Sequence, residues 1–152
     1  MDIDRDAPAA AEGSTRIAAP PQTVWAVISD IAAWPTWNPE IRSVTFDGPL
    51  EPGSEFRWRS GPSSLVSRLE VVDPPREIAW TGRTMGIRAV HVFRFEEADG
   101  GTLARSEESW SGLLPSLLRS FSRRRIQRAI DHALGTLRSE AERRAAERIE
   151  GP

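Results

Sequence analysis

Apolar residues recur at spacings of three and four along the last third of the chain. From Leu118 onward the spacing continues through Ile126, Ile130, Leu134 and Leu137, with arginine and glutamate between them. This period predicts one long helix over residues 114–149 with a single apolar face. Such a helix is stable in a folded domain only when its apolar face packs on another layer.

The region upstream of that helix alternates with a period of two, which is typical of β-strands. Turn signals such as Gly48-Pro49, Gly61-Pro62 and Asp99-Gly100 separate the runs. A short helix is expected after Pro20-Pro21. The predicted strands cover residues 13–19, 41–46, 53–60, 65–71, the neighbourhood of residues 78–80, and then 87–97 and 102–111. The order of elements predicts an α+β fold in which a curved antiparallel sheet wraps around the C-terminal helix.

Length and composition define one domain and exclude several kinds of chemistry. The chain has 152 residues, a net charge of −2 and no cysteine, and all 20 basic residues are arginine. We expect residues 1–12 to form a disordered tail and residues 13–148 to form a single ligand-binding domain. The charge gives no argument for nucleic-acid binding, and no apolar run is long enough to span a membrane. A cytoplasmic protein is expected.

The turn at Asp99-Gly100 allows the register of the last hairpin to be worked out. With a two-residue turn, Ala98 faces Gly101 and His91 faces Glu108 on the adjacent strand. Strand parity then directs both side chains toward the core. This histidine–glutamate pair is the one candidate polar site on an otherwise apolar wall. The two groups could simply satisfy each other's polar atoms in the interior, anchor a ligand, or act in general acid–base catalysis.

Two segments resemble a known family: TVWAVISDIAAWPTWNP at residues 23–39 and ESWSGLLPSLL at residues 108–118. Together with the strand pattern, they are similar to the START/SRPBCC superfamily, in its polyketide cyclase/dehydrase and lipid-transport-like branch. The resemblance covers roughly residues 13–145. It implies the helix-grip fold (START-like, Bet v 1-like), with a deep cavity between sheet and helix. That cavity would hold an apolar or aromatic small molecule.

The inward positions of the predicted strands and helix supply candidates for the cavity wall. Aromatic rings provide large apolar area and stacking surfaces, although the same rings could simply pack the core. Two further tryptophans lie in the loop that would cover the cavity mouth. The candidate ligand-binding residues are Trp34, Trp37, Phe56, Trp58, Leu69, Trp80, His91, Phe93, Glu108, Trp110, Ala129 and Ala133.

The sequence leaves three functions open. The first is a carrier or sensor that buries a small hydrophobic molecule without chemistry. The second is a polyketide aromatase/cyclase or dehydratase, a class usually associated with arginine, tyrosine and histidine in the pocket. This chain has no tyrosine and no arginine clearly on an inward face. The third is a regulatory domain with a vestigial cavity. No catalytic residue is assigned, and no cofactor or metal site is expected.

Two features of the long helix remain to be placed. Gly135 stands within the helix, where glycine is costly unless a close approach requires it, so we expect it or Ala133 to face a bulky side chain from the sheet. Arg123, Arg124 and Arg125 could form a solvated face or an anion site. Their apolar neighbours Leu117, Leu118 and Phe121 could serve as a gate or as a homodimer contact.

Overall fold

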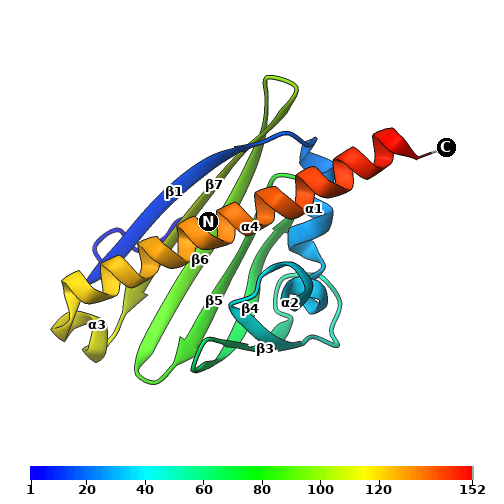
Figure 1. The fold of residues 1–152 in the computed structure, drawn as a ribbon. Coiled ribbons are helices and arrows are strands. Elements are labelled where there is room, and N and C mark those ends of the chain that lie inside the picture. The colour runs from blue at the N-terminus through cyan, green and yellow to red at the C-terminus, as the bar shows by residue number, and fades with distance from the viewer. Residues whose placement is uncertain (152) are drawn as a thin grey trace.

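The computed structural model describes residues 1–151 and has one curved sheet with helices on its inner side (Figure 1). The predicted α+β arrangement, an antiparallel sheet around a long C-terminal helix, is confirmed. No helix in residues 1–151 is long and apolar enough to cross a membrane. The elements in chain order are β1 (Ala9–Ile17), α1 (Pro21–Ser29), the 3₁₀ turn η1 (Ile31–Ala33), α2 (Trp34–Trp37), β2 (Ile41–Thr45), β3 (Glu55–Ser60), β4 (Ser63–Asp73), β5 (Glu77–Thr84), β6 (Ile87–Ala98), β7 (Gly101–Ser111), α3 (Leu113–Leu117) and α4 (Arg119–Glu150).

The strands follow one another in the order β1-β7-β6-β5-β4-β3-β2, with every neighbouring pair antiparallel. The predicted register of the last hairpin is confirmed, because Ala98 faces Gly101 and His91 faces Glu108. Asp99 and Gly100 have φ angles of 50° and 79°. Positive φ at both central residues is the requirement of the two-residue hairpin turn that suits the twist of the strands.

The C-terminal helix is interrupted, which the sequence prediction of one helix over residues 114–149 did not include. At Leu118 the backbone leaves the helical region, with φ −122° and ψ 52°, and α3 and α4 meet there. The apolar spacing continues across the break through Leu114, Leu117 and Phe121, so periodicity carries no signal for it. Beyond the break, α4 buries a continuous stripe of small and apolar side chains: Ser122, Ile126, Ile130, Leu134, Leu137 and Ala141.

The N-terminal segment differs from the expected tail over residues 1–12. Strand β1 begins at Ala9, and the residues before it cover the outer face of the sheet. There Ile3 is buried in a small cluster with Ala79 and Val92. The guanidinium of Arg5 also lies 2.7 Å from a carboxylate oxygen of Glu107. A single isoleucine and scattered charges make this contact, and they leave no periodic signature in the sequence.

Of the two positions expected to face a bulky side chain, Gly135 and Ala133, Gly135 does not. A Cβ placed on Gly135 would meet nothing within 4 Å, whereas one placed on Gly13 would lie 2.9 Å from Cγ2 of Ile130. The glycine that allows sheet and helix to approach closely is therefore Gly13 on β1, and not Gly135 on α4. Ala133 is half-buried and packs against the core cluster.

Two alanine substitutions should move the stability in opposite directions. Gly13→Ala should lower the free energy of unfolding by about 1–3 kcal/mol, because Ile130 is fully buried and has little room to move. Gly135→Ala should raise it by about 1 kcal/mol, because alanine is the better helix former and the site is open. Urea denaturation of both variants measures the two changes. Equal effects of the two substitutions would contradict this placement of α4.

Candidate functional site

The deep part of the space between sheet and helix is filled by aromatic side chains. Trp34, from the short helix α2, lies at its centre, with ring-centroid distances of 5.5 Å to Phe56 and 5.2 Å to Trp80. Its indole nitrogen donates a 2.9 Å hydrogen bond to the carbonyl oxygen of Ile28. Leu69 and Phe93 are buried in the same cluster. These candidate lining residues therefore contact one another and form core.

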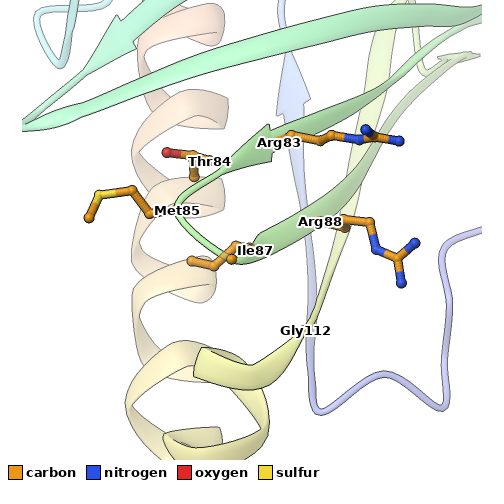
Figure 2. Close-up of a pocket in the computed structure, with 7 residues that line it drawn as sticks. Arg83, Thr84, Met85, Ile87, Arg88 and Gly112 are labelled. Carbon is orange, nitrogen blue, oxygen red and sulfur yellow. The ribbon is translucent and has the colours of Figure 1, made fainter.

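Two pockets in the part of the chain that the structure describes are peripheral. The larger, of about 540 Å³, is an open pocket around the β5–β6 turn at residues 83–88 and reaches Gly112. Figure 2 shows Met85 and Ile87 on the side of this turn opposite to Arg83 and Arg88. The second, of about 320 Å³, involves residues of β2, β3 and β4. Neither pocket has the lining expected for an enclosed cavity under α4.

A row of small residues crosses the concave face of the sheet. Strand pairing places Ala89 beside Gly82 and Gly82 beside Ser67, with Trp110 next to Ala89 at the other end. We refer to Ala89, Gly82 and Ser67 as the small-residue row. Trp58 closes the far end, because its indole nitrogen donates a 3.0 Å hydrogen bond to Oγ of Ser67. Ala89, Trp58 and Trp110 are half-buried, whereas Gly82 and Ser67 are buried, so solvent reaches the row at its two ends. We refer to this partly exposed surface over the row as the hollow.

The next row across the sheet carries the polar pair. Nδ1 of His91 lies 3.9 Å from Oε2 of Glu108, within ion-pair range but too long for a hydrogen bond. Each group has another partner. Nε2 of His91 and Oγ of Ser106 are 2.9 Å apart, and Oε1 of Glu108 accepts a 3.0 Å hydrogen bond from the indole nitrogen of Trp110. The pair therefore meets as predicted but without the expected direct hydrogen bond.

Burial determines the charge state of His91. Its ring lies between Trp80 and Phe93, at centroid distances of 4.8 and 4.7 Å. Loss of solvent lowers the pKa of His91 below its ordinary value of 6.5, and the Glu108 carboxylate raises it by a smaller amount. The folded protein thus holds a neutral imidazole. Because the unfolded chain binds this proton more readily, the stability present above about pH 6.5 decreases as the pH falls toward the folded pKa.

The remaining candidate residues have mixed positions. Ala129 is exposed, so it does not line an enclosed cavity, and the prediction from the apolar spacing was wrong in this respect. Trp37 is half-buried, and its indole nitrogen has no acceptor within residues 1–151. Sequence reasoning did not select Ser67, Gly82 or Ala89. Strand parity places all three inward, but their small size gave no reason to single them out.

No group of three or more histidine, cysteine, aspartate or glutamate side chains in residues 1–151 converges in a way that could hold a metal ion. The polar chemistry described for this face of the sheet therefore consists of the imidazole, one carboxylate and the hydroxyl groups of Ser67 and Ser106.

Comparison with known proteins gives a family and a fold. The profile described as "Polyketide cyclase / dehydrase and lipid transport" matches residues 8–142. No curated protein sequence matches this chain. Solved structures with low identity share the fold, and three of them are described below.

The first of these structures is the hypothetical protein jhp0584 from Helicobacter pylori, at 14% identity and TM-score 0.81, covering 91% of each chain. The second is the Zhui aromatase/cyclase from Streptomyces sp. R1128, at 20% identity and TM-score 0.74, covering 89% of this chain and 94% of that one. The third is a START superfamily protein from Mycobacterium smegmatis, at 18% identity and TM-score 0.66, covering 91% of this chain and 97% of that one. The fold is thus the helix-grip fold expected from the sequence.

The coupling between His91 and Glu108 can be measured directly. Glu108→Gln should lower the pKa of His91 further, because it removes the nearby negative charge that favours the imidazolium. NMR titration of the imidazole resonances gives this pKa. Glu107→Gln on the opposite face of β7 is the matched control and should leave the pKa unchanged. An unchanged pKa in Glu108→Gln would show that the two groups do not interact.

Proposed function

The chain belongs to the polyketide cyclase/dehydrase and lipid transport family, and from this premise we propose that it binds a small hydrophobic or aromatic molecule. The site is the hollow over the small-residue row, between Trp58 and Trp110. The observation that carries this proposal is a stretch of small side chains flanked by two half-buried tryptophans on the concave face of the sheet. The neighbouring part of this face is filled by core side chains, so we place the ligand at the open end.

The geometry of the hollow suits a planar apolar ligand. The ligand would contact the half-exposed side chains at the two ends of the row, because the space over Gly82 is narrow: a Cβ there would lie 3.0 Å from Oγ of Ser67. The tryptophan rings at either end offer faces or edges for aromatic contact. A ligand that fills this space removes the exposed area of Ala89, Trp58 and Trp110 from water, which is the main favourable contribution to binding.

Polar groups at the edge of the hollow would orient the ligand. Neutral His91 offers a ring nitrogen, and Glu108 offers a carboxylate oxygen that is free to accept a second hydrogen bond. A ligand with a hydroxyl or enol group at one end would therefore be bound in a preferred direction. An aliphatic ligand without such a group would leave the second oxygen of the Glu108 carboxylate without a hydrogen-bond donor and shielded from water, at a cost in affinity.

A second candidate function is the aromatase/cyclase or dehydratase reaction of a polyketide chain. The supporting observation is that a neutral imidazole faces the hollow and can accept a proton from an acidic carbon between two carbonyl groups. Two features weigh against it. The chain has no tyrosine, and among the described strands each arginine has the parity of the outer face, as Arg57, Arg88 and Arg105 illustrate. Binding without chemistry therefore remains the first proposal.

Filling the hollow should weaken binding without changing the fold. Ala89→Leu should weaken the affinity for the uncharged fluorescent probe N-phenyl-1-naphthylamine about tenfold, since overpacking a tight apolar site costs roughly 1–3 kcal/mol. Fluorescence titration measures the dissociation constant. Ala146→Leu, an identical substitution at an exposed position near the end of α4, should leave the affinity unchanged. Equal affinities of wild type and Ala89→Leu would place the binding site elsewhere.

The catalytic alternative requires a separate test. A synthetic poly-β-keto thioester cyclises spontaneously to a mixture of products, which liquid chromatography with mass spectrometry resolves. A cyclase should shift this mixture toward one ring pattern, and His91→Phe should abolish the shift while keeping the affinity for N-phenyl-1-naphthylamine. If wild-type protein leaves the mixture unchanged and still binds the probe, the protein is a binding protein for which this reaction has no support.

A further inference from the structure

Large apolar side chains protrude into solvent where β7 leads into the C-terminal helices. Leu113 is 74% exposed, Leu117 is 72% exposed and Phe121 is 50% exposed. Met85, at the turn between β5 and β6, is 89% exposed. Exposed apolar residues are ordinary when scattered, but a group of this size concentrated at one end of a domain marks an interaction surface.

The parts of this group lie at the same end of the molecule. In Figure 1, α3, the beginning of α4 and the β5–β6 turn lie at the same end. Gly112, the residue before α3, is in such close contact with the carbonyl oxygen of Gly86 that a Cβ could not be accommodated. Met85 and Leu113 are the chain neighbours of these two glycines. We refer to Met85, Leu113, Leu114, Leu117, Leu118 and Phe121 as the apolar tip.

Arginines without acidic partners surround the apolar tip. No acidic residue occurs between Leu113 and Ile130, and none of the arginines of that segment forms an ion pair within residues 1–151. In contrast, Arg138, Arg143 and Arg144 near the other end of α4 each pair with a glutamate. The unpaired arginines of the first part of α4 are Arg119, Arg123, Arg124, Arg125 and Arg128.

Two further arginines extend this positive charge to the neighbouring turn. Arg83 and Arg88 face each other directly across β5 and β6, and neither has an acidic partner in the described chain. Like charges at directly opposed positions are unfavourable unless an anion lies between them or nearby. Arg125 also lies over the ring of Phe121, 5.8 Å from its centroid, so charge and apolar surface are in contact. The chain as a whole has a net charge of −2, so the positive charge is local.

We infer that this end of the protein docks on the surface of an anionic lipid bilayer. The leucines, Phe121 and Met85 would insert among the acyl chains, and the arginines would bind the lipid phosphates. Protruding aliphatic side chains next to basic residues are the features that drive binding in the membrane interface. A fluid acyl layer also accepts separate protruding side chains without the matching holes that a folded partner would need.

A second copy of the chain fits this surface less well. A two-fold dimer contact would place the same patch on both subunits, and the arginines of one patch would face those of the other. That arrangement concentrates like charge without the acidic residues needed to balance it. An acidic protein satisfies the charge but leaves the highly exposed leucines without a fitted surface. The bilayer satisfies both requirements.

Cosedimentation with vesicles tests this inference on the full chain. Binding is expected to vesicles of 70% phosphatidylcholine and 30% phosphatidylglycerol, and not to vesicles of phosphatidylcholine alone. Arg123→Gln/Arg124→Gln should reduce binding about twenty-fivefold, since each arginine near an anionic surface contributes roughly a factor of five. Leu117→Ser/Phe121→Ser should also reduce binding, because insertion of the apolar tip is lost.

The matched control is Arg57→Gln/Arg59→Gln, which removes two exposed arginines from β3 and should leave vesicle binding unchanged. An equal loss in this control would show that binding depends only on the net charge of the protein, and it would overturn the inference. Full binding by Leu117→Ser/Phe121→Ser would also overturn it. Absence of binding to the anionic vesicles would also overturn it and favour an acidic protein as partner. A concentration-dependent dimer abolished by Leu117→Ser/Phe121→Ser would identify a second copy as the occupant. The binding of N-phenyl-1-naphthylamine is measured without vesicles. The proposed ligand site and the proposed membrane surface are therefore tested independently.

Discussion

The packing of α4 on the sheet determines which part of the concave face is exposed to solvent. The helix lies along β1 and approaches it closely at Gly13, where Ile130 occupies the space of the missing side chain. A helix held at that edge covers only part of the concave face. The strands in the middle of the sheet therefore keep inward-facing residues such as Ala89 and Trp58 half-exposed. The position of the helix, which the close contact at Gly13 allows, thus leaves the small-residue row partly exposed.

The filled part of the concave face has a different cause. Trp34 enters from α2 and contacts Phe56 and Trp80, so the volume that a deep cavity would need is occupied by the protein's own indole ring. Its hydrogen bond to the carbonyl oxygen of Ile28 keeps it there. The proposed site is the hollow at one end, with a chemical character set by two tryptophans, one neutral histidine and one carboxylate.

The sequence predicted the features that follow from local rules. The turn at Asp99-Gly100 determined the register of the last hairpin, and parity then placed His91 and Glu108 on the same face. Parity does not, however, specify the depth of a residue or which atoms bond. His91 hydrogen-bonds with Ser106, and Glu108 with Trp110, because of the side-chain rotamers in the folded state. Depth, rotamers and the break at Leu118 depend on tertiary packing, which a one-dimensional pattern does not contain.

The distribution of charge along α4 opposes the dipole of the helix. The peptide groups of a helix place partial positive charge at its N-terminus, where carboxylates are favourable and cations are not. In α4 the first turn contains no acidic residue, and arginines occupy the first turns. Repulsion between the arginines and the helix dipole therefore destabilises the first turns of α4. An anion that binds there reduces this repulsion. This end of the helix should be most ordered when its counter-charge comes from outside the protein.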